Sequence, residues 1–170
     1  MQRCETGPVM LRPALPADDP RILGWNEQDV QFLAPMDPER LGYLKERAHA
    51  VEVIHIGPTT VGFVVTFVEG ADYDSPNYRW FAGREEEFHY VDRIVVDPQY
   101  RGQGLAGRVY AMLADRFPTR PMCAEVNFAP PNPASLAFHQ RLGFTEVGRL
   151  GAQPNGVVLL VRPPQRPCGV

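Results

Sequence analysis

The residues with the clearest chemical potential form a glycine turn between a β-rich run and a helix-like run. In "VVDPQYRGQGLAGRVYAML", Gly102 and Gly104 lack the Cβ atoms that would keep a ligand away from the backbone. The helix predicted next would direct its free N–H groups and its positive dipole end into this turn. Arg101 adds a positive charge at the edge. This combination is typical of a phosphate or diphosphate site.

Read literally, residues 102–107 are the G-x-G-x-x-G fingerprint of dinucleotide-binding proteins. Glu125 follows about twenty residues later, where an acid would bind the ribose of NAD. However, residues 97–101 separate the glycines from the preceding strand, and the motif lies late in the chain. An NAD-binding oxidoreductase is therefore the less favoured interpretation. A kinase-type phosphate loop is excluded because no Gly-Lys-Ser/Thr follows.

The cysteines and histidines form no recognisable metal or disulfide pattern. Cys4, Cys123 and Cys168 are odd in number and widely separated, and the four histidines show no ligand spacing with them. We predict a metal-free protein. Cys123 is predicted to be a buried strand residue, because no histidine is near it in the sequence to activate a thiolate.

The elements that must position these residues follow from periodicity. Strands are predicted at Val9–Arg12, Val51–Ile56, Thr60–Phe67, Tyr90–Val96, Met122–Asn127, Phe144–Leu150 and Val157–Val161. Helices are predicted at Leu105–Phe117, at Pro133–Gly143 and in two pieces within residues 14–50, broken at Pro35 and Pro38, with Asp37 as a cap. This order implies a mixed α/β sheet with helices on both faces. We predict one domain over residues 1–163 and a disordered tail at residues 164–170.

The segment Glu69–Phe88 is long, acidic and aromatic without a clear period, which predicts a functional loop or lid. Residues 69–92 hold seven acidic and two basic residues, whereas residues 93–170 hold nine basic and four acidic ones. This field would suit a cationic ligand beside the acidic segment and a polyanion in the C-terminal half. A solvated surface loop is the open alternative.

Composition places the chain among ordinary globular proteins, with 44% hydrophobic and 22% charged residues. It has no apolar run of about 18 residues, so no transmembrane helix or membrane partner is expected. The N-terminal stretch lacks the apolar core of a signal peptide, which predicts a cytoplasmic protein. No block of Lys and Arg with interleaved aromatic residues indicates a nucleic-acid partner.

Residues 90–150 resemble the GCN5-related N-acetyltransferase (GNAT) superfamily. The family's acetyl-CoA motif, V-x-P then Q/R-x-x-G-x-G/A opening a helix, is matched by Val96-Asp97-Pro98 and by residues 99–104. Its second motif is a strand ending in Glu-Val, then N-x-x-[AS]-x-x-[FL]-Y-x-x-[LG]-G-F. This motif is matched by Glu125-Val126, Asn132, Ser135, Phe138, His139 and Leu142-Gly143-Phe144. Residues 1–68 are compatible with the family but carry no signature.

The resemblance implies a GNAT-like fold, with a central, mostly antiparallel sheet splayed at the acetyl-CoA strand. It implies acetyl-CoA as co-substrate and no metal. The backbone of Ile94, Val95 and Val96 would hold the pantetheine arm, and Asn132 and Ser135 would contact the cofactor from the far side. The diphosphate would be bound by Arg101, Gly102, Gln103, Gly104, Leu105, Ala106 and Gly107.

The implied reaction is direct transfer of an acetyl group to an amine in a ternary complex. A base must deprotonate an ammonium group whose pKa is near 10.4. Glu125 matches a base position used by some family members. Asp92 is the second candidate, and the two-residue period of a strand predicts that it shares a face with Tyr90, Ile94 and Val96. A structural ion pair is the open alternative for each carboxylate.

The chain departs from the family pattern at His139, where the family has the tyrosine that protonates the departing thiolate. A histidine can do this, since its pKa is adjustable around 6.5. The open alternative is an exposed helix residue, with water or the substrate protonating the thiolate. A backbone N–H near Val95 is expected to stabilise the oxyanion. The long connection "NFAPPNP" leaves open whether Asn127 or Asn132 takes the family position.

In this family the acceptor commonly enters opposite coenzyme A. We expect the amine of a small molecule or peptide, attracted by the acidic residues 85–87. Tyr78, Trp80 and Tyr90 are expected to pack against its apolar part. The protein would be a monomer or homodimer. A non-catalytic acyl-CoA-binding module is the second interpretation, with His139 marking loss of activity.

Overall fold

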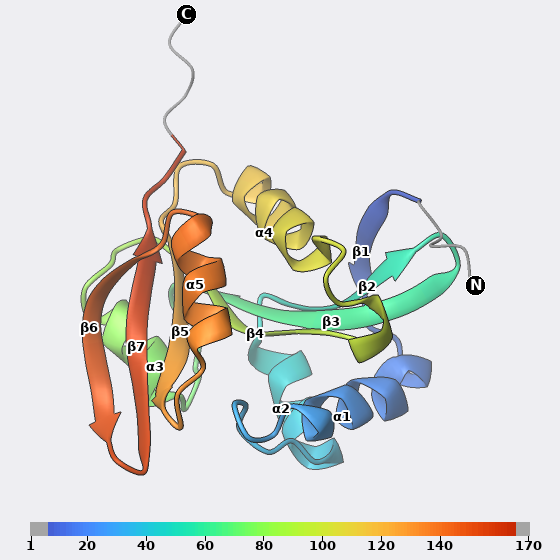
Figure 1. Ribbon diagram of the computed structural model, residues 1–170, viewed down its shortest axis with the longest axis horizontal. Coiled ribbons are helices and arrows are strands. Elements are labelled where there is room, and N and C mark those ends of the chain that lie inside the picture. Colours follow the sequence, from blue (N-terminus) through green and yellow to red (C-terminus); the bar gives the residue numbers. More distant parts are fainter. Residues whose placement is uncertain (1–6, 166–170) are drawn as a thin grey trace, which may run out of the picture.

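The computed structural model describes residues 7–165 of the chain, and a seven-stranded sheet forms its centre (Figure 1). The strands run in the order β1-β2-β3-β4-β5-β7-β6. They are β1 Val9–Pro13, β2 Ala50–Ile56, β3 Thr59–Val68, β4 His89–Val96, β5 Met122–Ala129, β6 Thr145–Ala152 and β7 Asn155–Arg162. Only β4 and β5 pair parallel. The mostly antiparallel sheet is the one implied by the resemblance, and it differs from the parallel sheet that an NAD-binding fold requires.

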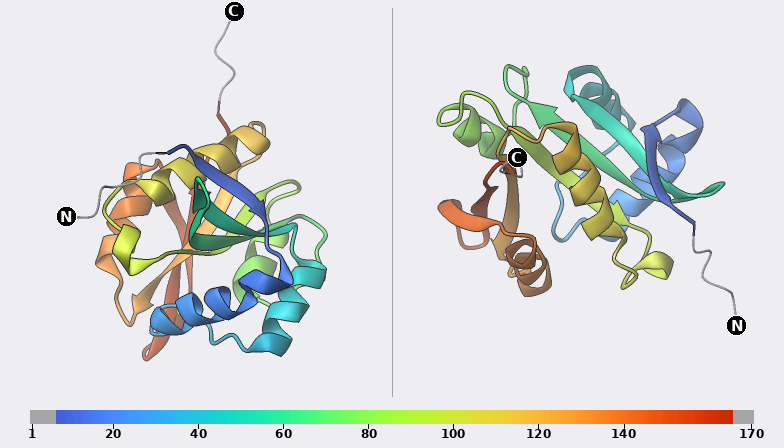
Figure 2. Two further views of the ribbon diagram at one scale, coloured as in Figure 1. Left: turned by 90° about the vertical axis from the view of Figure 1, so that its right-hand side faces the viewer. Right: turned by 90° about the horizontal axis from the view of Figure 1, so that it is seen from above.

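Helices cover both faces of the sheet, as predicted (Figure 2). The helices α1 Asp19–Gln28, α2 Pro38–Arg47 and α3 Pro76–Ala82 pack on one face, and α4 Leu105–Arg116 and α5 Pro133–Arg141 pack on the other. Two short 3-10 helices, Pro16–Asp18 and Pro98–Tyr100, precede α1 and α4. Asp37 caps α2 as predicted, accepting a hydrogen bond from the backbone N–H of Arg40 at 2.7 Å. Each sheet face therefore has its own apolar core.

The segment 69–88 is not the irregular loop that we predict from the sequence, because it contains α3. Ser75 caps this helix by accepting a hydrogen bond from the Tyr78 N–H, and Pro76 occupies its first turn. Tyr78 and Phe81 lie three residues apart and are buried against the sheet. A seven-residue helix is too short to show an apolar period, which is why periodicity missed it.

β4 and β5 pair over two positions only, His89 with Met122 and Tyr90 with Cys123. Beyond these positions the two strands separate, and this is the opening that the resemblance implied. The next residue pairs of β3 and β4 show a second irregularity. Thr66 pairs with Val91 and Val65 pairs with Arg93, so Asp92 is the extra residue of a β-bulge.

The bulge overturns the predicted arrangement of side chains on β4. Because Asp92 is the extra residue, the alternation shifts by one position after it. Tyr90 and Val95 belong to the core under α1, α2 and α3, whereas Ile94 and Val96 pack against the core under α4. Asp92 contacts Tyr73 of the first core and therefore does not share a face with Ile94 and Val96.

Further expectations concern membrane-spanning helices, the C-terminal residues and the cysteines. No helix within residues 7–165 is both long enough and apolar enough to cross a bilayer. Residues 166–170 of the predicted disordered tail, with Cys168, lie outside the described part, as does Cys4. Cys123 is buried in β5 as predicted, and burial raises the pKa of its thiol.

His89, at the start of β4, is a buried titratable group. Its side chain is 1% exposed, and neither ring nitrogen has a hydrogen-bond partner within the described residues. The rings of Phe117 and His49 lie 4.9 and 6.3 Å away. Burial, together with the nearby charges of His49 and Arg116, lowers the pKa of His89 to about 4.

This histidine is expected to make stability fall on acidification. In the unfolded chain its pKa is near 6.5, so the unfolded state binds more protons between pH 6.5 and about 4. The stabilisation is present above pH 6.5 and is lost as the pH falls through this window, by ~3 kcal/mol at most. Urea unfolding of wild type and His89→Leu at several pH values measures the difference. His55→Leu, at a partly exposed strand position, is the control. Equal slopes for wild type and His89→Leu would contradict the prediction.

Candidate active site

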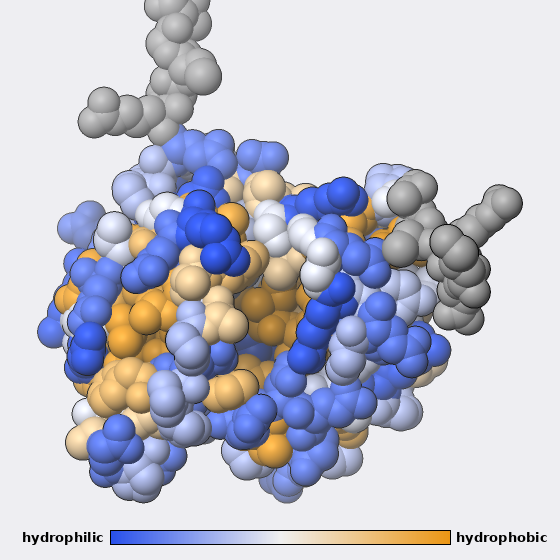
Figure 3. All heavy atoms as spheres, viewed as in Figure 1, coloured by the Kyte–Doolittle hydropathy of each residue, from blue (hydrophilic) through white to orange (hydrophobic). Residues whose placement is uncertain are grey.

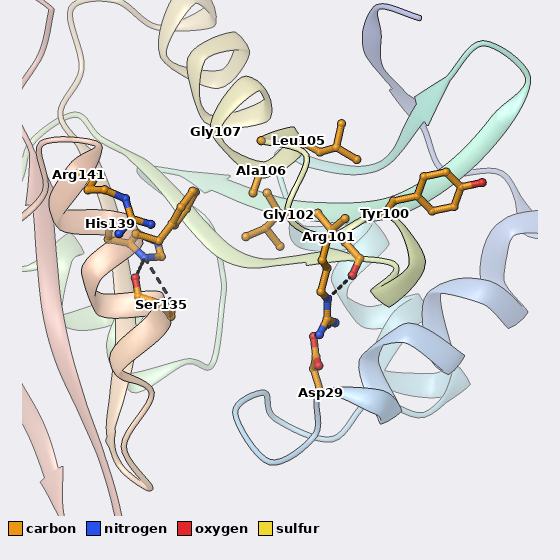
Figure 4. A pocket seen from close by; sticks show the side chains of 14 residues that line it. Asp29, Tyr100, Arg101, Gly102, Leu105, Ala106, Gly107, Ser135, His139 and Arg141 are labelled. Atoms are coloured by element: carbon orange, nitrogen blue, oxygen red, sulfur yellow. Dashed lines mark hydrogen bonds and ion pairs between the residues drawn. The ribbon is translucent and has the colours of Figure 1, made fainter. Parts of the chain in front are cut away.

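The glycine turn opens into a cavity of about 420 Å³ between α4 and α5. Figure 3 shows a hollow on this face, with apolar atoms at its floor and hydrophilic residues along its rim. In Figure 4, the first turn of α4 and the residues of α5 lie on different sides of this cavity. The predicted cofactor residues that line it are Ile94, Val96, Arg101, Gly102, Gly104, Leu105, Ala106, Gly107 and Ser135.

The two glycines have the conformation and the free space that an anion site needs. Gly102 and Gly104 have φ angles of +76° and +74°, in the left-handed region. No atom lies within 4 Å of the position that a Cβ would take at either residue. Gly104 is the N-cap of α4 and provides no capping side chain, which leaves the N–H groups of the first turn free for a ligand. The turn therefore fits a diphosphate group.

Backbone direction distinguishes the three residues predicted to hold the pantetheine arm. The N–H of Asp97 donates to Val61 of β3, and residues two apart on a strand direct their N–H groups to the same side. Val95 therefore faces β3, whereas Ile94 and Val96 face the opening toward β5. Val95 is also 1% exposed and lines no cavity. The N–H of Val95 itself therefore does not face the opening.

Two other predicted cofactor residues lie outside the first cavity. Gln103 does not line it. Asn132 caps α5 by accepting a hydrogen bond from the Ser135 N–H at 3.3 Å, and it lines an adjoining cavity of about 280 Å³. Asn127 lines this second cavity as well as a third one. Asn132 is thus the residue placed as a helix cap, whereas Asn127 lines both the second and the third cavity.

The second cavity lies at the opening between β4 and β5, and its lining overlaps with those of the cavities on the two faces of the sheet. It shares Arg101, Ile94 and Ser135 with the glycine-turn cavity. It shares Glu125 and Asp92 with a third cavity of about 670 Å³, next to α1 and α3. A ligand held by the glycine turn and a second one entering from the third cavity would therefore meet beside Glu125.

Glu125 has an environment suited to a general base. Its Oε1 accepts a hydrogen bond from the Tyr90 hydroxyl at 2.8 Å. Its buried Oε2 has no hydrogen-bond partner of good geometry within the described residues, and the side chain of Asn77 is a polar group close to the carboxyl. Burial, and next the charge of Asp92, raise the pKa of the Glu125 carboxyl to about 8. A carboxyl with this pKa exchanges protons near neutral pH.

Asp92 has a different environment, although it lies on the neighbouring strand. Its Oδ1 accepts from the Tyr73 hydroxyl at 2.6 Å, and its Oδ2 accepts from Arg93 Nε at 2.8 Å. The side chains of Asp92 and Arg93 are 5% and 4% exposed. Both oxygens thus have hydrogen-bond partners, and Oδ2 belongs to a buried ion pair, which makes Asp92 less available as a base than Glu125.

His139 is 5% exposed, so the alternative of an exposed helix histidine is wrong. Its Nδ1 lies 2.8 Å from the backbone carbonyl of Ser135 and therefore carries the proton of that hydrogen bond. Its Nε2, 2.7 Å away, then accepts the proton of the Tyr110 hydroxyl. Burial lowers the pKa of His139, which keeps the ring neutral. Neither nitrogen directs a proton into the cavity in this arrangement.

The three residues expected beside the acceptor do not line any of these cavities. Tyr78 and Tyr90 are buried, because α3 and β4 direct them into the core; the Tyr78 hydroxyl donates to the carbonyl of Val68. Trp80 packs against Gly148 and under the guanidinium of Arg84. The acidic residues 85–87 also lie outside the cavity linings, and Glu87 is 3.9 Å from Arg120.

The cavities are also lined by residues that no local sequence pattern indicates. Asp29 at the end of α1 accepts from Arg101 at 2.8 Å and lines the first two cavities (Figure 4). Tyr110 reaches the second cavity from α4. Arg40 and Asp74 line the third. These residues come together only through long-range packing. Among residues 7–165, no group of three or more His, Cys, Asp or Glu side chains could hold a metal ion.

The family model for the Acetyltransferase (GNAT) family matches residues 15–144. No curated protein sequence matches the chain. The fold is similar to the Escherichia coli ribosomal-protein-S18-alanine N-acetyltransferase, with 18% identity, a TM-score of 0.66 and coverage of 94% of this chain and 96% of that one.

Two Arabidopsis thaliana structures are also similar. NAA60 in complex with acetyl-CoA has 16% identity, a TM-score of 0.68 and coverage of 91% of this chain and 98% of that one. Naa50 in complex with the bisubstrate analogue CoA-Ac-MVNAL has 13% identity, a TM-score of 0.64 and coverage of 91% and 97%. At these identities the likeness concerns the fold.

Asp92→Asn is expected to lower the pKa of Glu125. The substitution removes the neighbouring charge but leaves the burial, so the pKa should fall below about 8 and stay above its ordinary value. Carboxyl carbon NMR across a pH titration measures it, and thermal unfolding verifies the fold. Asp115→Asn, on the exposed side of α4, should leave the pKa of Glu125 unchanged. A Glu125 pKa that is the same in Asp92→Asn and wild type would mean that burial alone causes the shift.

Proposed function

Since this chain belongs to the GNAT acetyltransferase family, we propose that it transfers an acetyl group from acetyl-CoA directly to the amine of a small molecule or peptide. The observation that carries the proposal is the junction of the cavities at the β4–β5 opening, beside the unpartnered Oε2 of Glu125. The acetyl donor would approach from the α4 face and the amine from the α1 face. Direct transfer needs this geometry, because both substrates must be bound at once.

On the donor side, the glycine turn and the first turn of α4 would bind the diphosphate of coenzyme A through backbone N–H groups. The gap-facing backbone of Ile94 and Val96 would pair with the amides of the pantetheine arm. This arrangement directs the thioester toward the opening, where Glu125 lies.

On the acceptor side, Glu125 Oε2 would take a proton from the incoming ammonium group, directly or through a water molecule. The neutral nitrogen then forms a bond to the thioester carbonyl carbon, and the carbon–sulfur bond breaks with its electron pair on sulfur. A gap-facing N–H of β4 would stabilise the negative charge on the carbonyl oxygen. Because the neutral His139 donates only to the Ser135 carbonyl, we favour water or the acceptor's own proton as the source for the thiolate.

The second interpretation, a non-catalytic acyl-CoA-binding module, rests on the engaged ring of His139. Release of free thiol from acetyl-CoA in the presence of an amine panel separates the two functions. A transferase releases thiol and acetylates an amine, whereas a binding module shows affinity for acetyl-CoA without amine-dependent thiol release.

Gly104→Val is expected to weaken coenzyme A binding at least about tenfold. Valine is strained at a φ of +74°, and its methyl groups would fill the open space in front of the backbone N–H groups. Isothermal titration with coenzyme A measures the affinity, and circular dichroism verifies the fold. Gly42→Val is the matched control, because Gly42 lies on α2 away from the cavity with open space around it. A folded Gly104→Val protein with wild-type affinity would remove the glycine turn from the cofactor site.

Glu125→Gln is expected to lower kcat/KM about 10²-fold at pH 7 while changing the affinity for acetyl-CoA little. A base works in its unprotonated form, so the wild-type rate should rise with pH and bend near pH 8, where Glu125 titrates. The variant should lack this bend, and its rate should rise only with the fraction of neutral amine. Its deficit should shrink at high pH, where more of the amine is already neutral. Glu86→Gln, on an exposed turn, is the control. An unchanged rate at pH 7 would transfer the role to Asp92 or to water.

A further inference from the structure

The third cavity, on the α1 face, would receive the acceptor and has a charge pattern that restricts its ligands. It lies between the α1–α2 loop at residues 30–35, the start of α3 and the ends of β5 and β7. Its apolar walls are Phe32, Leu33, Pro35, Pro130 and Val157. Its ionisable side chains are Arg40, Arg93, Tyr73, Asp74, Asp92 and Glu125.

Both arginines of this cavity are already paired. Arg40 binds Asp74 with two hydrogen bonds of 2.7 Å, and its guanidinium lies 4.5 Å from the centre of the Tyr43 ring. Arg93 donates to Asp92 at 2.8 Å and also to Asn26 at 2.8 Å. Within the lining described here, no cationic side chain is therefore free to bind an anionic group of a ligand.

The carboxyl groups outnumber the arginines, and the extra one is Glu125. Its Oε2 is the buried oxygen without a hydrogen-bond partner. It suits an ammonium or amine donor, and its neighbour Asp92 adds negative charge. An anion placed beside Glu125 would find no free cationic side chain in this lining and would be buried without a partner, which is costly.

This pattern discriminates between two forms of the same amine. In a free amino acid, the carboxylate is attached to the carbon that bears the nitrogen, so it would enter the cavity together with the amine. In a peptide or an amino-acid amide, the same position holds an uncharged amide. Asn127 and Asn155, which carry side-chain amides, line the cavity. These side-chain amides can pair with an amide of the ligand.

We propose that this cavity selects amines whose neighbouring group is an amide, such as a peptide N-terminus or an amino-acid amide, and discriminates against free amino acids. The proposal rests on the N-acetyltransferase function proposed above. Arg40, held by Asp74, is the residue that keeps the cavity closed to carboxylates.

L-leucinamide and L-leucine form the matched pair of acceptors, because they differ only at the group beside the amine. Rates are referred to the concentration of neutral amine, since the carboxylate raises the pKa of the neighbouring ammonium. The expected kcat/KM is at least about tenfold higher for leucinamide. Equal values, or a preference for leucine, would overturn the proposal.

Asp74→Asn tests the role of the ion pair, because asparagine keeps the shape but leaves the charge of Arg40 uncompensated. The ratio of leucinamide to leucine kcat/KM should fall at least about threefold, through faster reaction of leucine. Asp72→Asn, in the same segment but outside the cavity lining, should leave the ratio unchanged. A folded Asp74→Asn protein with the wild-type ratio would contradict the proposed selection.

Binding distinguishes failure of this proposal from failure of the transferase function. Isothermal titration of each acceptor into the protein saturated with coenzyme A needs no turnover. If neither acceptor releases thiol but leucinamide binds at least about tenfold tighter, the transferase function fails and the selection stands. If leucine binds as tightly as leucinamide, the selection fails whether or not thiol is released.

Discussion

Separation of β4 from β5 after Tyr90 and Cys123 is the constraint on which the site depends. A continuous sheet would separate the face covered by α4 from the face covered by α1. The separation instead leaves backbone N–H groups of Ile94 and Val96 without a strand partner and connects the cavities of the two faces. Donor and acceptor can then approach one point from opposite sides, as direct transfer requires.

The β-bulge at Asp92 sets what each side of this opening contains. The extra residue shifts the alternation of side chains by one position. The apolar side chains of Ile94 and Val96 then face α4, and Asp92 lies beside Arg93 on the other face. A buried ion pair is costly to desolvate, and it persists only when its remaining hydrogen-bonding groups are satisfied. Tyr73, Asn26 and the carbonyl of Ala34 provide these partners and at the same time hold the α1–α2 loop in place.

The donor and acceptor cavities differ in electrostatics, and the difference matches the proposed anionic donor and the proposed amine acceptor. Free backbone N–H groups at the first turn of α4 face the donor cavity. The acceptor cavity is lined by three carboxyl groups and two arginines, and both arginines are ion-paired. Glu125 lies at the boundary, and its raised pKa results from burial and from Asp92. The Asp29–Arg101 ion pair links the end of α1 to the glycine turn.

Features that depend on a few consecutive residues were determined by the sequence alone. The glycine turn and the Asp37 cap follow from local sterics and hydrogen bonding, and so do most strands and helices. Glu125 and the motif residues around it were indicated by the resemblance to the family. Tertiary structure decided what depends on register and long-range packing. The bulge placed Ile94 and Val96 on the sheet face opposite to the one predicted from Tyr90. Tyr78 is buried in the core, and Tyr110 of α4 forms a hydrogen bond with His139 of α5. Arg40 and Asp74 are 34 positions apart, and Asp29 and Arg101 are 72 apart. Pairs this far apart in the sequence form because the packing of the whole fold brings them together, so a local pattern of residues does not predict them.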